Sequence, residues 1–128
     1  MKYKFLIINL LFSGVMLSQS IKSVTSEEFK NIISSKSVIL IDVRSESEFT
    51  QGHIPKAIHI DVNGDDFEKE IKKIAKKNKQ LALYCRSGRR SKIAASKLSN
   101  LGIQIYDLNN GYTEWQKSGY ATSSNGGK

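Results

Sequence analysis

The hydrophobic and polar positions along this chain form two patterns, short continuous apolar runs and longer stretches with helical spacing. Apolar runs that lack polar alternation are typical of strands buried on both faces of a sheet. Such a run predicts a strand at residues 38–43, and four further strands are predicted at 21–24, 57–60, 81–84 and 103–108. Helical segments are predicted between them and after them, from 26 to about 34, at 45–49, from 65 through the lysine-rich stretch, from 90 or 91 to about 101, and within 109–118.

The ends of these helices carry recognisable signals. Thr25 and Glu28 have the spacing of a capping box, in which each residue satisfies an amide of the other. Asp65 and Asp66 open the third helix with negative charge at its positive end. Gly102 follows the fourth helix, where a glycine commonly ends the last turn. These signals support the predicted order of elements.

The alternation of strands and helices predicts an α/β domain. Its sheet would have five strands, mainly parallel, with helices on both faces in three layers. A chain of 128 residues is long enough for one such domain and too short for two. We assign the domain to residues 21–121 and expect a flexible tail at 122–128. Ligands of such sheets bind beyond the carboxyl ends of the strands, which is where Cys85 is predicted to lie.

The N-terminal segment 1–20 has the order of a signal peptide. Lys2 and Lys4 precede an apolar run at 5–17, and the small residues Ser18 and Ser20 follow it. The run is shorter than the roughly 20 residues that a membrane-spanning helix needs. We therefore expect cleavage after Ser20, export without a stable membrane anchor, and a periplasmic or cell-envelope location if the source is bacterial.

The composition narrows the possible ligands. The formal net charge is +8, with 39% hydrophobic and 25% charged residues, as in ordinary globular domains. The single cysteine excludes a disulfide within the chain, and two histidines leave little material for a metal site. No metal or organic cofactor is expected. The lysines of the third helix lie on most of its faces outside an apolar stripe, so we interpret them as a solvated surface and expect no nucleic-acid binding. These lysines are Lys69, Lys72, Lys73, Lys76, Lys77 and Lys79.

The candidate chemistry lies in the segment CRSGRRS, which follows a buried strand and precedes a helix. Successive backbone amides in such a loop can point inward and bind an anion, and the helix start adds its own unpaired amides. These amides and the arginines favour a thiolate, the reactive form of cysteine. We expect Cys85 to be the nucleophile and the rest of the loop to bind an anionic substrate. The substrate-binding candidates are Arg86, Ser87, Gly88, Arg89, Arg90 and Ser91.

Four segments together resemble the rhodanese family. The loop has the form C-x-x-G-x-R-S, and residues 42–49 have the form D-x-R…E-[FY]. Residues 52–57 have the form G-H-I-P-x-A, and the stretch 110–120 is similar to the family's terminal G-G…W…G-[YF] segment. The resemblance covers roughly 24–121. Asn110 and Lys56 stand where the family commonly has glycine, and we expect both to lie away from Cys85.

The resemblance implies a fold and a double-displacement reaction. Cys85 would take sulfur from an anionic donor such as thiosulfate, hold it as a persulfide and pass it to a thiol or to cyanide. Asp42, Arg44 and Glu48 would be structural support, with Arg44 paired to Glu48 or another acid and Asp42 holding neighbouring loops. His53 is expected in a structural turn, and Trp115 in the core.

Two other functions remain open from the sequence. Cysteine phosphatases of related α/β domains use C-x5-R, but Ser91 is the sixth residue after Cys85, so the loop is one residue too short. Alternatively, the domain is a persulfide-relay or redox-sensing module that acts on a protein thiol partner. A docking face for that partner is expected at Tyr112 or along the helix of residues 69–79.

Overall fold

The computed structural model describes residues 21–75 and 79–124. The predicted signal peptide at 1–20 lies outside the described residues, as do Lys76, Lys77 and the end of the predicted tail. No helix in the described part of the chain is long and apolar enough to cross a membrane.

The sheet has five strands, all paired in parallel, in the order β1-β5-β4-β2-β3. The strands are β1 (Ile21–Val24), β2 (Val38–Asp42), β3 (Ile58–His59), β4 (Gln80–Tyr84) and β5 (Ile105–Leu108). The predicted α/β class and the parallel sheet are therefore confirmed. β3 is shorter than predicted, because it pairs with only the last two residues of β2 at the edge of the sheet.

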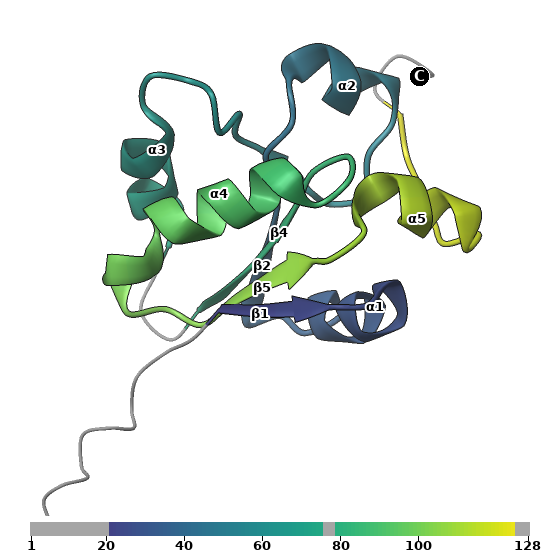
Figure 1. Ribbon diagram of the computed structural model, residues 1–128, viewed down its shortest axis with the longest axis horizontal. Coiled ribbons are helices and arrows are strands. Elements are labelled where there is room, and N and C mark those ends of the chain that lie inside the picture. Colours follow the sequence, from purple (N-terminus) through teal and green to yellow (C-terminus); the bar gives the residue numbers. More distant parts are fainter. Residues whose placement is uncertain (1–20, 76–78, 125–128) are drawn as a thin grey trace, which may run out of the picture.

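Helices cover both faces of the sheet and create two cores (Figure 1). The helices are α1 (Ser26–Ile33), α2 (Glu46–Gln51), α3 (Phe67–Ile74), α4 (Arg89–Lys97) and α5 (Gly111–Lys117), with a 3-10 turn at Ser99–Leu101. α3 and α4 contribute Ile71 and Ala94 to one core, and α1 and α5 contribute Phe29 and Trp115 to the other. Trp115 is buried, as predicted. This is the expected three-layer arrangement.

Local capping sets where the helices begin. The Glu28 amide donates to Thr25 Oγ1 at 3.1 Å, and the Thr25 amide donates to Glu28 Oε1 at 2.9 Å, which confirms the capping box. Ser45 and Glu48 form a second box at the start of α2. Asp66 makes no side-chain hydrogen bond at the start of α3, so this acid acts there only through its charge.

Two segments have backbone features that were not predicted from the sequence. Lys56 has a φ of +74°. This is the left-handed region that favours glycine, which gives a physical reason for glycine being common there in the family. The first residues of the predicted tail are held in place. Ser123 exchanges two backbone hydrogen bonds with His53, at 2.8 and 2.9 Å, and the Ser124 hydroxyl donates to the Thr50 carbonyl.

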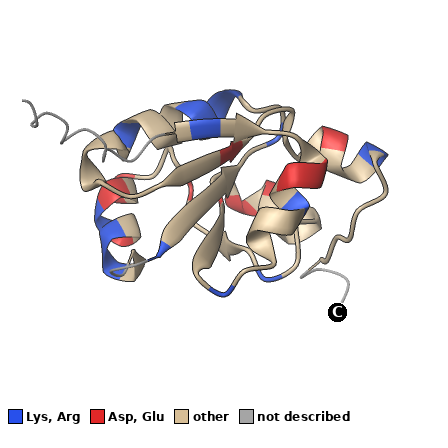
Figure 2. Cartoon of the chain, turned by 90° about the horizontal axis from the view of Figure 1, so that it is seen from below, with Lys and Arg blue, Asp and Glu red and all other residues tan. Residues whose placement is uncertain are grey.

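Charge is spread over the fold. Figure 2 shows Lys and Arg on several helices, strands and loops rather than on a single element. α3 ends at Ile74, so the helix is shorter than the predicted lysine-rich stretch. This distribution agrees with a solvated surface.

Candidate active site

Cys85 comes directly after β4, which lies between β2 and β5 in the middle of the sheet. The residue is 1% exposed and packs in the core beneath α3 and α4. The chain then turns through Arg86, Ser87 and Gly88 into α4, so the sulfur faces the first turn of a helix. A thiol at the carboxyl end of a central strand occupies the usual ligand position of an open parallel sheet.

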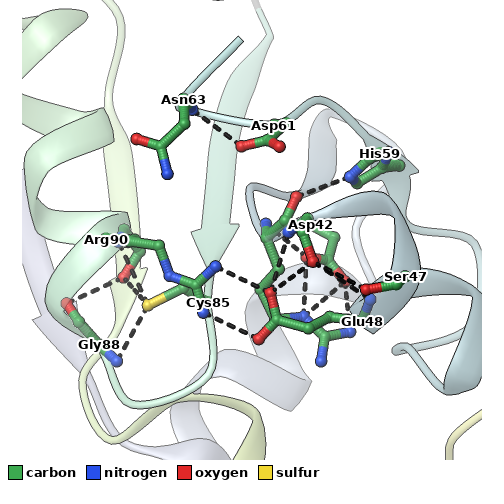
Figure 3. Close-up of polar contacts among 12 residues, drawn as sticks. Asp42, Ser47, Glu48, His59, Asp61, Asn63, Cys85, Gly88 and Arg90 are labelled. Atoms are coloured by element: carbon green, nitrogen blue, oxygen red, sulfur yellow. Dashed lines mark hydrogen bonds and ion pairs between the residues drawn. The ribbon is translucent and has the colours of Figure 1, made fainter.

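Two backbone amides point at the sulfur. The Gly88 N–H donates to Cys85 Sγ at 3.1 Å and the Ser91 N–H donates at 3.3 Å (Figure 3). Gly88 has a φ of +105°, and a Cβ added there would lie 2.1 Å from the Asn109 carbonyl oxygen. Only glycine allows this turn, and the turn directs the amides inward. Such donors stabilise negative charge on the sulfur.

The start of α5 closes the other side of the loop. The Tyr112 amide donates to the Cys85 carbonyl at 2.8 Å, and the Thr113 amide donates to the Arg86 carbonyl at 3.1 Å. Gly111 has a φ of +72°, and a Cβ there would lie 2.3 Å from the Arg86 carbonyl oxygen. The expectation that Asn110 lies away from Cys85 is wrong, because Asn110 begins the helix that contacts the loop. Its φ of −101° needs no glycine, so asparagine fits at this position.

Arg90 is engaged by Glu48 rather than free. Its Nη1 and Nη2 donate to the two Glu48 oxygens at 2.8 and 2.9 Å, a bidentate ion pair between α4 and α2. Hydrogen bonding from Arg90 outweighs desolvation and lowers the pKa of Glu48 to about 2. Figure 3 shows the guanidinium between Glu48 and Cys85. Arg90 therefore provides a fixed charge beside the sulfur.

Arg86 and Arg89 are exposed, and neither side chain makes a hydrogen bond or ion pair within residues 21–75 and 79–124. Ser87 is also exposed, whereas Ser91 is buried. The first amides of a helix have no acceptor inside it. The amides of Arg89 and Arg90 are therefore further hydrogen-bond donors beside the Arg86 and Arg89 side chains. This is the part of the loop that an incoming anion can reach.

The predicted support residues are Asp42, Arg44 and Glu48, and Arg44 pairs with Asp42. Arg44, 4% exposed, bonds Asp42, which is fully buried, through Nε to Oδ1 at 3.0 Å and Nη2 to Oδ2 at 2.7 Å. Its Nη2 also donates to the Gly52 carbonyl at 2.6 Å. Burial lowers the pKa of Arg44, but the hydrogen bond and charge of Asp42 outweigh burial and raise it. Arg44 is thus paired with an acid as expected, but the acid is Asp42 and not Glu48.

Neither histidine makes a hydrogen bond to Cys85. His53 is buried, stacks on the Phe49 ring at 3.9 Å and places Nδ1 2.8 Å from the Phe49 carbonyl. A carbonyl only accepts, so Nδ1 carries the proton. His59 Nε2 lies 2.7 Å from the Arg44 carbonyl. Both rings are structural, and no cluster of three or more His, Cys, Asp or Glu side chains that could hold a metal ion occurs in the described chain.

A buried cluster that was not predicted from the sequence lies behind the loop. Asp107 on β5 is fully buried and accepts hydrogen bonds from Ser91 Oγ, from Ser23 Oγ at 2.8 Å and from Lys92 Nζ at 2.8 Å. The available signal was an acid inside the apolar strand 103–108, since a buried charge needs partners.

Tyr112 is not a surface residue. It is 6% exposed, and its ring lies 4.4 Å from the Arg44 guanidinium. The expectation that it is a surface residue is wrong. It instead helps to line a pocket of about 460 Å³ beside the loop, together with Glu48, Arg86 and Gln116.

Comparison with known proteins agrees with this geometry. The family model described as the rhodanese-like domain matches residues 25–118. The putative sulfurtransferase YtwF of Bacillus subtilis (strain 168) is 33% identical over 97 residues, which cover 75% of this chain and 91% of YtwF. The crystal structure of a rhodanese-related protein from Thermoplasma volcanium has a TM-score of 0.70 and 28% identity, covering 80% of this chain and 97% of that one.

Two further relatives are longer proteins. The tRNA uridine(34) hydroxylase of Buchnera aphidicola subsp. Schizaphis graminum is 32% identical over 94 residues, which cover 69% of this chain and 30% of that protein. The putative sulfur carrier protein YrkF of Bacillus subtilis is 30% identical over 100 residues, which cover 77% of this chain and 52% of YrkF. The chain thus spans about a third to a half of these proteins. Together with the family match over 25–118, the fold and the cysteine loop show that this chain belongs to the rhodanese-like domain family.

Proposed function

We propose that this protein is a sulfurtransferase that carries sulfane sulfur as a persulfide on Cys85. The observation that carries the proposal is the sulfur at the end of β4, accepting hydrogen bonds from the Gly88 and Ser91 amides at 3.1 and 3.3 Å. These donors stabilise a sulfur anion, both as the attacking thiolate and as the terminal sulfur of a persulfide. The relative named a putative sulfurtransferase supports the same reaction class.

The proposed donor is thiosulfate or a similar small anion. The Cys85 thiolate attacks the outer sulfur of thiosulfate. The bond between the two thiosulfate sulfurs breaks, its electron pair leaves with sulfite, and Cys85 holds the persulfide anion. No net oxidation occurs and no proton is required. Arg86 and Arg89, with the first amides of α4, would bind the dianionic donor and the sulfite that leaves.

The proposed acceptor is a thiolate or cyanide. It attacks the outer sulfur of the persulfide, takes that sulfur, and returns the electron pair of the sulfur–sulfur bond to Cys85 as thiolate. The pocket of about 460 Å³ beside Arg86 has room for a small hydrophilic thiol and is lined partly by charged and amide side chains such as Glu48 and Gln116. No metal or organic cofactor takes part in either step.

The test is direct detection of the intermediate. Protein of residues 21–128 is purified under reducing conditions, freed of reductant and treated with thiosulfate beside a Cys85→Ser control. A gain of one sulfur atom by intact mass spectrometry, absent from the control and reversed by cyanide with release of thiocyanate, is expected. An unchanged mass on a thiol that still reacts with iodoacetamide would remove thiosulfate as donor, and phosphate-ester hydrolysis would then be assayed.

A protein thiol is a second candidate acceptor. It is favoured by the exposure of Arg86 and Arg89 around the loop and by the relative named a putative sulfur carrier protein. Persulfide that forms with thiosulfate but moves slowly to every small thiol, and rapidly to a protein thiol, would support this relay. Saturable, rapid turnover with a small thiol would support the enzyme that acts on small molecules.

Export is proposed from the basic, apolar and small-residue order of residues 1–20. It places the thiol in an oxidising compartment. Fractionation of cells that produce the full chain should recover a product that lacks the segment 1–20 outside the cytoplasm, whereas full-length protein inside the cytoplasm would contradict the proposal.

A further inference from the structure

We propose that Asp107, a buried carboxylate on β5, is a positioning residue that holds the Ser91 hydroxyl proton away from Cys85 and so limits how readily the thiol ionises. The inference rests on the proposed function for its effect on sulfur transfer. Its effect on the reactivity of the thiol does not depend on the sulfur donor.

Asp107 is surrounded by donors. It is fully buried, its Oδ2 accepts from Ser23 Oγ and Lys92 Nζ, each at 2.8 Å, and its Oδ1 accepts from Ser91 Oγ. Lys92 also donates to Asn109 Oδ1 at 3.1 Å. An ammonium group only donates. Asp107 is therefore an acceptor toward all three partners.

The Ser91 hydroxyl has one hydrogen to give and two acceptors beside it. One is Asp107 Oδ1, and the other is the Gly88 carbonyl at 3.2 Å. Hydrogen bonds to a charged acceptor are stronger than those to a neutral one, and Asp107 Oδ1 is the charged acceptor of the two. The hydrogen thus points to Asp107.

The direction of this hydrogen determines which part of the Ser91 hydroxyl faces the sulfur. Cys85 Sγ lies 3.7 Å from Ser91 Oγ, and with the hydroxyl hydrogen on the far side, the oxygen presents a lone pair to the sulfur. A lone pair accepts the S–H of a thiol but repels a thiolate. The thiolate is left with the Gly88 and Ser91 amides as hydrogen-bond donors and with the Arg90 charge beside it. Asp107 opposes the stabilisation that these groups provide.

A proton relay from Cys85 through Ser91 to Asp107 would use the same contacts. A carboxylate is a much weaker base than a thiolate. Asp107 is therefore a poor final acceptor for the thiol proton. It is better suited to fix the orientation of the Ser91 hydroxyl than to accept the proton of Cys85.

The test is Asp107→Asn. Ser23 and Lys92 are donors, so the amide oxygen would face them and the amide nitrogen would face Ser91 Oγ as a donor. The hydroxyl hydrogen then has the Gly88 carbonyl and the sulfur as acceptors, and a thiolate is the stronger of the two because it is charged. At a pH where the native protein is mostly thiol, the rate of iodoacetamide alkylation should rise about fivefold, which corresponds to one hydrogen bond of ordinary strength, and the pH midpoint of alkylation should fall.

Two controls separate positioning from packing. The double variant Asp107→Asn with Ser91→Ala should not show the increase in alkylation rate, because that increase requires the Ser91 hydroxyl. Ser23→Ala removes a different donor from the same carboxylate and should leave the midpoint where it is. An unchanged or higher midpoint in folded Asp107→Asn would overturn the proposal, as would an equal fall in the double variant.

Ser91→Ala alone keeps the proposal testable where Asp107→Asn does not fold. If the Ser91 hydroxyl only accepts a hydrogen bond from the thiol, removing the hydroxyl does not raise the pH midpoint of alkylation. If the hydroxyl donates to the thiolate, the midpoint rises and the proposal fails. Because alkylation needs no sulfur donor, a midpoint shift without persulfide formation would refute the proposed function and leave this inference standing.

Discussion

Gly111→Ala tests whether the close approach of α5 to the cysteine loop shapes the site. A Cβ at this position would lie 2.3 Å from the Arg86 carbonyl oxygen and 2.7 Å from the Ser87 amide nitrogen. Both atoms belong to the backbone, and Cβ atoms in proteins essentially never come closer than 3.0 Å. The loop must therefore move by about 0.7 Å at the residue next to Cys85, because no flexible side chain can give way.

The expected losses follow from that displacement. The φ of +72° adds strain of about 1 kcal/mol for any residue with a Cβ, and the overlap adds about 1–3 kcal/mol. The free energy of unfolding should fall by about 2–4 kcal/mol. A misplacement approaching about 1 Å at the reacting atoms lowers rates about 100-fold, so the rate of persulfide formation should fall by about that factor.

Gly102→Ala is the matched control. Gly102 has nearly the same backbone conformation, with a φ of +70°, and no heavy atom lies within 4 Å of the added Cβ. The control should lose about 1 kcal/mol and keep its rate of persulfide formation. Urea unfolding and time-resolved mass spectrometry after mixing with thiosulfate measure the two quantities. Equal rates in the two variants would show that the contact between Gly111 and the loop does not position the sulfur.

Three further predictions use other parts of the fold. Lys56→Gly should raise the free energy of unfolding by up to about 1 kcal/mol, because it removes a left-handed residue with a Cβ; Lys56→Ala keeps that strain, and an equal gain there in thermal unfolding would contradict the reason given. The Arg90 ion pair lowers the pKa of Glu48 from 4.5 to about 2, so it contributes stability above about pH 4.5 that is lost as the pH falls toward 2. Glu48→Gln should flatten this part of the curve by about 1 kcal/mol, since a partly exposed pair is weakened by solvent; an unchanged curve in urea titrations would show that the pair is not formed in solution. Phe29→Ala should cost about 3–5 kcal/mol, because this fully buried ring packs edge-on against Tyr84 and Trp115; a loss below about 1 kcal/mol by denaturant unfolding would mean that this core is loosely packed.

Much of the fold follows from local signals in the sequence. The buried strands were predictable from their apolar runs, because a strand covered on both faces has no solvent side to show alternation. The start of α1 was predictable because its capping box joins residues three apart. The cysteine loop was recognisable for the same reason, since its sulfur and both amide donors lie within the short segment 85–91.

The contacts that the sequence did not specify join distant segments. Arg44 was expected to pair with Glu48 or another acid. It pairs with Asp42, and Glu48 pairs with Arg90, which lies far along the chain. Asn110 was expected to lie away from Cys85, but its helix contacts the loop because β5 lies next to β4 in the sheet. Nothing in the local sequence around these residues specifies such partners.

The sequence by itself determined the order of strands and helices and the composition of the loop around Cys85. Only the tertiary structure decided which charge faces which. The order β1-β5-β4-β2-β3 brings Asp107 on β5 behind Ser91 and places Glu48 opposite Arg90. The physical reason is that backbone conformation and capping depend on neighbours a few residues away, whereas the partners of a buried charge depend on which strands lie side by side.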